Sequence, residues 1–380
     1  MRCSFELDRN DPIYFAGERI KGRALLTTKS TLSFYQIFIL FVGEGKVRFR
    51  ACDKGESAHV VFRGRQIFVD TQTNVIQSRT LPAGTHTVSF DISVPSDCPT
   101  SVVTEFGKIW YEIKLCILKV GAHNIHKFKK PLTVLQPSNL NMRPELLIPL
   151  IQEDIQDFCC WRCVSGSVLL TLTIPFGGYA PGQKIPFKLE VDNQSSRRDL
   201  VGMKMRLNQI FKLKANDPKH YSYKVEHFVA ESYQKAKVLR LSKRIIEGTL
   251  TIPPVPPSSR NNNDIISVSY EAHLTVDLDD CQTHPDLYLP IVIGTIPLIQ
   301  SAEDPTYVAE LNAQTEDLPP SYDNYSPPTF EEAVIVGKTF IDIDEDAENR
   351  NDGFIPSYPM YTNFGSTPPS NTEGPSSALL

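Results

Sequence analysis

Two short stretches of this 380-residue chain are nearly identical: YFAGERI at residues 14–20 and YAPGQKI at residues 179–185. Both follow the pattern Tyr-x-x-Gly-[Glu/Gln]-[Arg/Lys]-Ile, and they lie far apart in the chain. In each copy a glycine, Gly17 or Gly182, supplies a tight turn, and the isoleucine begins an inward-facing alternation of apolar residues. The heptad therefore predicts the same turn and strand in both places.

A second pair of similar segments occurs in the same order. PTSVVTEFGKIWYE (residues 99–112) and PPSSRNNNDIISVSYE (residues 256–271) each run from proline and serine, across a loop, into a strand that ends in Tyr-Glu. The spacing between Tyr111 and Tyr270 is slightly shorter than that between the two heptads, a drift that changes in loop length produce. The alternative is chance likeness between β-sequences, but two anchors in one order favour a duplicated β-sandwich.

Strand patterns dominate residues 1–300. Apolar residues take every second position in HTVSFDISVP (86–95), KIPFKLEVDN (184–193) and SVSYEAHLTVDL (267–278). A period of two means one buried and one solvated face, which is typical of antiparallel sandwiches. No helical stretch is comparably strong, and IQEDIQDF (151–158) predicts one or two helical turns at most. We expect an all-β fold.

The C-terminal region, residues 301–380, differs in composition from the rest. It contains 15 Asp and Glu against two basic residues, Lys338 and Arg350, a net charge of −13 that leaves +8 for residues 1–300. It also holds 10 of the 29 prolines and few aliphatic residues. Such a composition buries too little apolar surface to offset chain entropy. We expect a mildly basic body and a disordered, acidic, Pro-rich tail.

Other sequence features favour a cytoplasmic protein. The segment at residues 1–6 contains no apolar stretch like that of a signal peptide. The richest apolar run, residues 32–42, is too short to span a hydrocarbon layer of about 30 Å. The eight cysteines are scattered, as expected for reduced thiols in the cytosol.

Several separated segments resemble the arrestin fold, and in particular the α-arrestins, the arrestin-domain-containing proteins. They are FELDRNDPIYFAGERIKGRALL (5–26), LPAGTHTVSFDISVPSDCPTS (81–101), KIWYEIKLCILKV (108–120), CVSGSVLLTLTIPFGGYAPGQKIPFKLEVDNQSSR (163–197) and DLYLPIVIGTIPL (286–298). The resemblance covers about residues 4–300. It implies two tandem immunoglobulin-like antiparallel β-sandwiches, residues 1–140 and 161–300, with a linker at 141–160 and the tail at 301–380. The basic, phosphate-sensing N-terminal strand of the visual and β-arrestins is not found, so activation by receptor phosphate is not expected.

The tail contains the motif Leu318-Pro319-Pro320-Ser321-Tyr322. Its two prolines restrict the backbone and preset a polyproline II turn for an aromatic groove, while Tyr322 offers a ring and a hydroxyl. Such Pro-Pro-x-Tyr motifs bind WW domains, and in α-arrestins the implied partners are the WW domains of HECT-type ubiquitin ligases. The alternative is that the motif arose by chance in a Pro-rich tail.

Weaker motifs surround it. Pro327-Pro328-Thr329-Phe330 resembles a second WW site with Phe330 in the tyrosine position, and loss of the hydroxyl costs about 1 kcal/mol. Asp304-Pro305-Thr306-Tyr307 and Ile355-Pro356-Ser357-Tyr358 keep one proline each. Tyr361-Thr362-Asn363-Phe364 fits a Tyr-x-x-bulky endocytic sorting signal, a common pattern.

Other chemistry is weakly indicated. Cys159, Cys160 and Cys163 supply three soft ligands without a fourth, so we expect structural thiols and no metal or other cofactor. No phosphate-binding Gly-rich loop, nucleophile elbow or zinc-protease motif occurs. Basic stretches at residues 127–130 and 197–198 suit either anionic lipid headgroups or a solvated sheet face. The body is not basic enough for a nucleic-acid partner.

These observations predict a non-enzymatic adaptor. It would link membrane-protein cargo, receptors or transporters, to a WW-domain ubiquitin ligase and so promote ubiquitination, endocytosis and trafficking at the plasma membrane and endosomes. One alternative is an arrestin-fold scaffold of endosomal sorting or retrieval complexes that acts without a ligase. Another is a thiol- or zinc-dependent enzyme centred on Cys159–Cys163.

Overall fold

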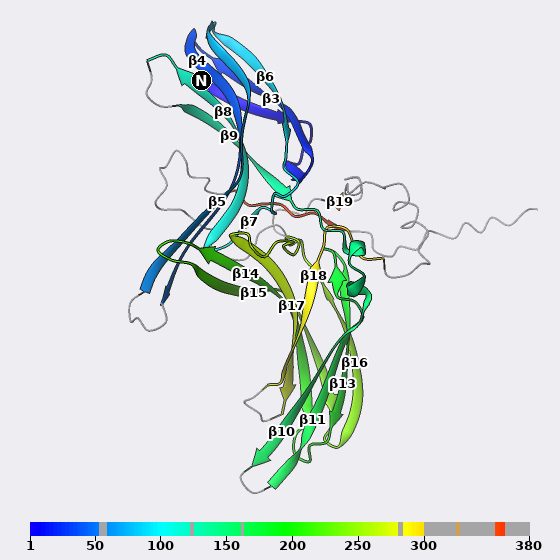
Figure 1. Ribbon diagram of the computed structural model, residues 1–380. Helices are drawn as coiled ribbons and strands as arrows, with labels where there is room; N and C mark the ends of the chain where they lie inside the picture. The colour runs from blue at the N-terminus through cyan, green and yellow to red at the C-terminus, as the bar shows by residue number, and fades with distance from the viewer. Residues whose placement is uncertain are drawn as a thin grey trace, which may run out of the picture.

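The alternating stretches form strands whose apolar side chains face inward. In β6 (Gly84–Ser93) the side chains of Val88, Phe90 and Ile92 are buried while their neighbours are exposed. β13 (Lys184–Asn193) and β17 (Ile266–Leu278) follow the same pattern. The computed structural model describes residues 1–52, 59–121, 125–160, 163–279, 284–299, 325–326 and 354–361. Within them the chain forms two β-sandwiches joined end to end (Figure 1).

The first sandwich, drawn from blue to cyan in Figure 1, has a three-stranded and a larger sheet. The smaller sheet has the order β1 (Arg2–Leu7), β3 (Arg19–Thr28), β6. The larger has the order β2 (Ile13–Phe15), β9 (His126–Leu135), β8 (Gly107–Lys119), β4 (Leu32–Cys52), β5 (His59–Leu81), and β7 (Val102–Val103) pairs with β8.

The second sandwich, green to yellow, repeats this plan (Figure 1). One sheet has the order β10 (Leu150–Cys160), β11 (Cys163–Ile174), β13, β16 (Ser242–Thr251). The other has the order β12 (Gly178–Tyr179), β18 (Asp286–Ile293), β17, β14 (Leu200–Ala215), β15 (Tyr221–Val238). In each sandwich a short strand, β2 or β12, pairs in parallel with the last strand, β9 or β18, while the other pairs in these sheets are antiparallel.

The duplication predicted from the heptads is confirmed at atomic level. Gly17 and Gly182 have backbone φ angles of +96° and +92°, which residues other than glycine rarely adopt. The isoleucines that follow each turn, Ile20 and Ile185, are fully buried. The chain therefore needs the same glycine in both sandwiches for the same backbone reason.

The second pair of sequence anchors is equivalent in structure as well. The Tyr111 hydroxyl donates to the carbonyl oxygen of Pro99 at 2.7 Å, and the Tyr270 hydroxyl to that of Pro256 at 2.5 Å. Each buried tyrosine thus fastens the preceding loop to its sheet, 12 residues upstream in one sandwich and 14 in the other.

A serine in each loop adds a matching brace. Ser101 exchanges two hydrogen bonds with Val134 of β9, and Ser258 exchanges two with Ile293 of β18. Both loops are therefore tied to the last strand of their sandwich as well as to the tyrosine strand.

The interdomain linker is shorter than the sequence predicts. Two short 3₁₀ turns, η1 (Leu140–Met142) and η2 (Pro144–Leu147), are followed at once by β10, so residues 150–160 belong to the second sandwich. The one or two helical turns allowed for residues 151–158 are absent from this strand. Ile151 and Ile155 suggest a helix because they are four residues apart, but both are exposed on a strand that lies at the edge of the described sheet and pairs there with β11.

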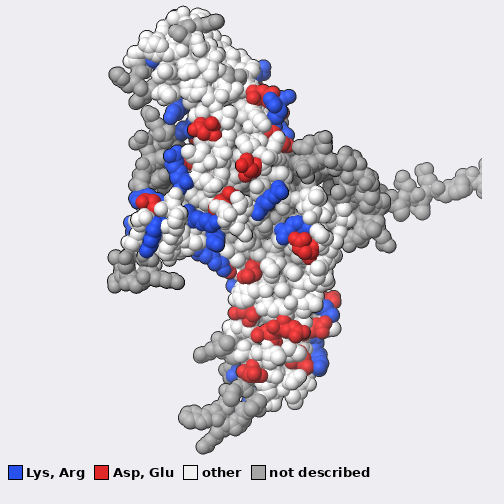
Figure 2. Space-filling model, in the orientation of Figure 1, with Lys and Arg blue, Asp and Glu red and all other residues white. Residues whose placement is uncertain are grey.

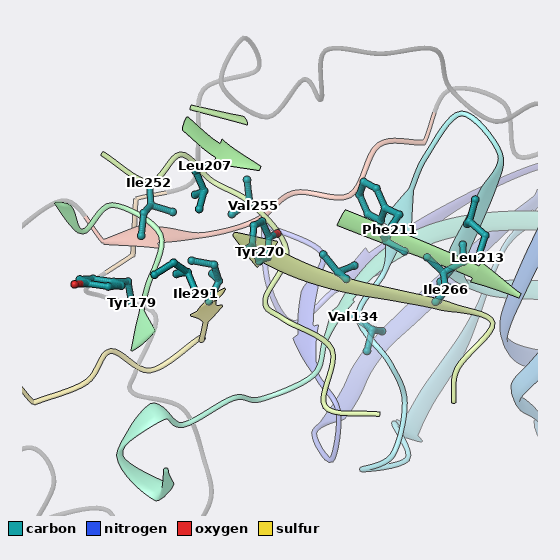
Figure 3. Close-up of a cluster of buried hydrophobic side chains, with 14 of the residues drawn as sticks. Val134, Tyr179, Leu207, Phe211, Leu213, Ile252, Val255, Ile266, Tyr270 and Ile291 are labelled. Atoms are coloured by element: carbon teal, nitrogen blue, oxygen red, sulfur yellow. The ribbon is translucent and has the colours of Figure 1, made fainter. Parts of the chain in front are cut away.

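The two sandwiches meet along an extensive junction. The long hairpin of β4 and β5 reaches down beside β14 and β15 (Figure 1), where the rings of Phe49 and Phe62 pack against Tyr221 and Tyr223. The apolar core continues through this region, and Figure 3 shows Val134 of the first sandwich near Phe211, Leu213 and Ile266 of the second. The body is therefore one packed unit.

Polar contacts also cross the junction. The backbone N–H of Arg63 donates to the carbonyl oxygen of Asp217 at 2.8 Å. The Gln66 side chain accepts a hydrogen bond from the backbone N–H of Ile265 at 2.8 Å, and the Gln136 side chain accepts one from the backbone N–H of Arg260 at 3.3 Å. Because these bonds have defined directions, they fix the orientation of the sandwiches as well as their contact.

Candidate functional site

A short piece of the C-terminal tail lies against the junction of the two sandwiches. Residues 354–361, with the sequence FIPSYPMY, run across it as an extended segment that ends in β20 (Met360–Tyr361). Figures 1 and 3 show it, in red or salmon, passing from the first sandwich to the second. We call these residues the clasp segment.

The first sandwich holds the clasp segment mainly through Tyr358. This side chain is 1% exposed and forms one buried cluster with Ile13 and Phe15 of β2 and Leu135 of β9. Its hydroxyl donates to the carbonyl oxygen of Ser101 at 2.9 Å. Ser101 already uses its N–H and hydroxyl to brace Val134, so this carbonyl is fixed in position before the tyrosine binds.

A backbone contact lies beside this cluster. The N–H of Ser357 donates to the Thr133 hydroxyl oxygen at 3.1 Å. Thr133 is in β9, and its own N–H donates to the carbonyl oxygen of Pro12. The parallel pairing of β2 with β9 thus places the apolar wall and the polar acceptor side by side.

The second sandwich holds the other end of the clasp segment through Tyr361. The Tyr361 N–H donates to the carbonyl oxygen of Pro181 at 3.0 Å, and its hydroxyl donates to that of Thr295 at 3.0 Å. A Cβ at Gly182 would lie 2.0 Å from the Tyr361 carbonyl oxygen. The turn of the second heptad is therefore also a place where the tail approaches the body very closely.

Burial sets the protonation of the tyrosines at this site. The loss of water contact raises the pKa of Tyr358 far above its usual value, and does the same for the neighbouring Tyr270. Both hydroxyls stay neutral across the physiological range, so each remains a hydrogen-bond donor. The contact between Tyr358 and Ser101 is accordingly insensitive to moderate changes of pH.

The residues predicted to bind WW domains lie outside the described residues. These are Leu318, Pro319, Pro320 and Tyr322, together with Pro327, Pro328 and Phe330, and the same holds for Asp304–Tyr307. Only Tyr325–Ser326 between the two motifs are described, as β19, which pairs antiparallel with β20. The tail predictions therefore stay predictions.

The structure gives a different role to two of the weaker motifs. Ile355–Tyr358 contains one proline of a WW motif, and Tyr361 begins the Tyr-x-x-Phe pattern, yet both sites contact the body. Sequence reasoning did not foresee this. A signal existed, because the clasp segment is uncharged and rich in large apolar and aromatic residues within an acidic tail.

The cysteine cluster lies at the end of one hairpin. Cys160, the last residue of β10, pairs with Cys163, the first residue of β11. Among the residues that can be described, no group of three metal-ligating side chains gathers, and four cysteines, Cys3, Cys52, Cys98 and Cys116, have free thiols. Burial raises the pKa of the Cys98 thiol to about 12 and that of Cys116 to about 11, which keeps both protonated and unreactive.

Surface charge is uneven over the body. Figure 2 shows Lys and Arg side chains gathered where Figure 1 draws β5, β14 and β15, and Asp and Glu side chains over the second sandwich. The basic strands carry Arg63, Lys212 and Lys224. The stretch at residues 127–130 lies in β9, and Arg197 and Arg198 lie between β13 and β14. In the described part of the chain no helix is long and apolar enough to cross a membrane.

Comparison with known proteins agrees with this architecture. The family model for the arrestin (or S-antigen) N-terminal domain matches residues 3–141, and that for the C-terminal domain matches residues 164–298. Together the two models cover most of both sandwiches, and the residues between them, 142–163, include η2 and β10.

Relatives in animals extend the match to most of the chain. Arrestin domain-containing protein 17 of Caenorhabditis elegans is 26% identical over 89% of this chain and 81% of its own length. Arrestin domain-containing protein 1 of Mus musculus is 26% identical over 88% of this chain and 73% of its own. Arrestin domain-containing protein 5 of Homo sapiens is 26% identical over 74% of this chain and 84% of its own.

Proposed function

Because this chain belongs to the arrestin family, with the N-terminal and C-terminal arrestin domains in order, we propose that it links membrane-protein cargo to a WW-domain ubiquitin ligase of the HECT type. The family supports an adaptor or scaffold role without chemistry of its own. The ligase, the cargo and the outcome, ubiquitination followed by endocytosis and trafficking, are the parts that the proposal adds.

The observation that carries the proposal is the Pro-Pro-x-Tyr motif at residues 319–322, which follows two arrestin domains in the sequence. The described part of the second sandwich reaches Ile299, whose N–H donates to the Asn141 side chain at 2.8 Å. Pro319 follows 20 residues later in the sequence, within the acidic, Pro-rich region, so the motif belongs to neither sandwich.

The mechanism requires only proximity. The junction of the two sandwiches fixes one surface for cargo, and the tail brings in the ligase, which supplies the chemistry. Binding both raises the effective concentration of ligase at the cargo to about the millimolar range. The strands with Arg63, Lys212 and Lys224 suit anionic lipid headgroups, which supports peripheral recruitment of a cytoplasmic protein to the plasma membrane and endosomes.

The decisive experiment compares ligase binding by the full chain and by Tyr322→Ala. We expect a tandem WW fragment of a HECT-type ligase to bind the full chain with micromolar affinity, about −8 kcal/mol, and to lose most of that affinity with Tyr322→Ala. Tyr307→Ala is the matched control, because Tyr307 has one preceding proline instead of two. Equal recovery of the wild-type chain and Tyr322→Ala would refute ligase binding through this motif and favour a scaffold that acts without a ligase.

The second motif tests whether tandem binding is used. Phe330→Tyr restores the hydroxyl that Phe330 lacks, which is worth about 1 kcal/mol or roughly a fivefold gain in affinity for a tandem WW fragment. A single isolated WW domain should gain much less. No gain with the tandem fragment would show that residues 327–330 are not a binding site.

A further inference from the structure

The clasp segment bridges two domains with very few residues. Its hydrogen bonds to the described part of the body include one each from Ser357 and Tyr358 to the first sandwich and two from Tyr361 to the second. The acceptors are the Thr133 hydroxyl and the carbonyl groups of Ser101, Pro181 and Thr295, which come from both sides of the junction. We call these four acceptor residues, with Ile13, Phe15, Leu135 and Gly182, the clasp-binding surface.

This surface selects for a tyrosine. Ile13, Phe15 and Leu135 surround the Tyr358 ring, and the carbonyl of Ser101 stands at its end. A phenylalanine would leave that buried carbonyl without its donor, and a phosphotyrosine would bring negative charge against the carbonyl oxygen in an apolar cavity. The surface therefore fits a neutral tyrosine and rejects its phosphorylated form.

The surface also selects for an extended, uncharged backbone. Ser357 and Tyr361 donate their N–H groups to it from positions at i and i+4. Pro356 and Pro359 flank Tyr358 and limit the conformations that binding must order. The clasp segment contains no charged residue, whereas residues 342–352 before it contain six acidic side chains. The neutral part of the tail is thus the part that meets the apolar wall.

The internal repeat supplies a control for the role of Gly182. Gly17 and Gly182 adopt the same left-handed conformation. A Cβ at Gly17 would meet only the Ser96 Cβ at 3.9 Å, whereas a Cβ at Gly182 would meet the backbone of Tyr361 at 2.0 Å. An alanine thus strains the backbone at both positions but displaces the clasp segment at one.

We propose that the clasp-binding surface is a docking site for an extended tyrosine peptide, and that residues 354–361 occupy it in cis as a clasp that joins the two sandwiches. Release of the clasp exposes this surface and Tyr358 together. A peptide of the same sequence then binds in trans to the vacated site. The proposal concerns the body and residues 354–361 alone and does not depend on a ligase.

The first test measures hydrogen exchange of the full chain. We expect the amides of Ser357 and Tyr361 to be protected in the wild-type chain, to lose that protection in Gly182→Ala, and to keep it in Gly17→Ala. Thr133→Val removes one acceptor with little change of shape and should speed exchange of the Ser357 amide about fivefold. Exchange at the rate of an unstructured peptide in the wild-type chain would overturn the proposal.

The second test measures binding in trans. A fluorescent peptide of residues 352–363 should bind the full-length Tyr358→Ala variant at least roughly tenfold more tightly than the wild-type chain, whose site is occupied. Adding Thr133→Val to Tyr358→Ala should weaken peptide binding about fivefold, and phosphorylation of the peptide at Tyr358 should abolish it. Equal binding to the wild-type chain and Tyr358→Ala, or no binding to Tyr358→Ala at about 1 mM peptide (roughly −4 kcal/mol), would overturn the proposal.

Discussion

The paired tyrosines Tyr111 and Tyr270 allow the same deletion to be made once in each sandwich. Tyr111→Phe removes a hydroxyl that donates to the carbonyl oxygen of Pro99. Tyr270→Phe removes a hydroxyl that donates to the Pro256 carbonyl and also accepts from the Gln209 side chain at 2.7 Å. The Tyr111 hydroxyl also has a hydrogen bond with the Cys98 thiol, which is a weak donor. The first deletion therefore removes one strong and one weak hydrogen bond, and the second removes two strong ones.

The expected costs follow from these partners. The strong hydrogen bond of Tyr111 is worth about 1 kcal/mol, and the loss with Tyr111→Phe should be close to that figure. Tyr270→Phe should cost about 2–3 kcal/mol, because the amide of Gln209, 1% exposed, is left without its acceptor in addition. For a sandwich of this size, about 1 kcal/mol corresponds to a fall of roughly 3–4 °C in Tm.

The assay must report on each sandwich separately, because two domains need not unfold together. Hydrogen exchange of the β8 and β17 amides during a urea titration meets this need. We expect the larger loss of stability in β17 with Tyr270→Phe and the smaller in β8 with Tyr111→Phe. Equal losses, or a larger loss at Tyr111, would refute the hydrogen-bond argument.

Three further predictions test other parts of the molecule. Burial raises the pKa of Asp264, so its ionised carboxylate lowers the stability of the fold above the folded-state pKa. Asp264→Asn should therefore raise the free energy of unfolding at pH 7, and this gain should disappear near pH 4. Urea titrations at the two pH values measure the difference. A Cβ at Gly64 would lie 2.6 Å from the Lys214 carbonyl oxygen across the junction, so Gly64→Ala should cost about 1–3 kcal/mol in the same assay. Tyr358→Ala should tighten binding of a tandem WW fragment about two- to fivefold, because release of the clasp also frees β19. Tyr322→Ala should abolish this binding, and calorimetry measures both effects.

The repeated features of this fold were predictable because their causes are local. A left-handed backbone conformation favours glycine, so the repeated Gly17 and Gly182 predicted tight turns, and both residues have positive φ in the structure. Strand alternation predicted the correct faces of β6, β13 and β17, since burial on one side of a sheet imposes a period of two. The likeness of Tyr111 and Tyr270 indicated equivalent strands, although their matched hydrogen bonds were not foreseen.

The features that sequence reasoning missed depend on distant partners. In the edge strand β10, Ile151 and Ile155 are on the exposed face, and the alternate positions of the less exposed face are polar, so the apolar pattern does not mark the buried side. The clasp was missed because its contacts join Tyr358 to Ser101 and Tyr361 to Thr295, across 257 and 66 residues of sequence. A motif interpreted only as a WW ligand gave no reason to look for such partners.

The clasp and the predicted ligase motif share one piece of backbone. β19, at Tyr325–Ser326, lies between Tyr322 and the second predicted motif and pairs with β20 of the clasp. If a tandem WW ligand binds residues 319–330 as proposed, it competes with this pairing, and ligand binding and closing of the clasp then oppose each other. Thermodynamic linkage requires the effect to be mutual. Any factor by which clasp release tightens ligase binding is also the factor by which ligase binding favours the open clasp, and hence an exposed clasp-binding surface on the body.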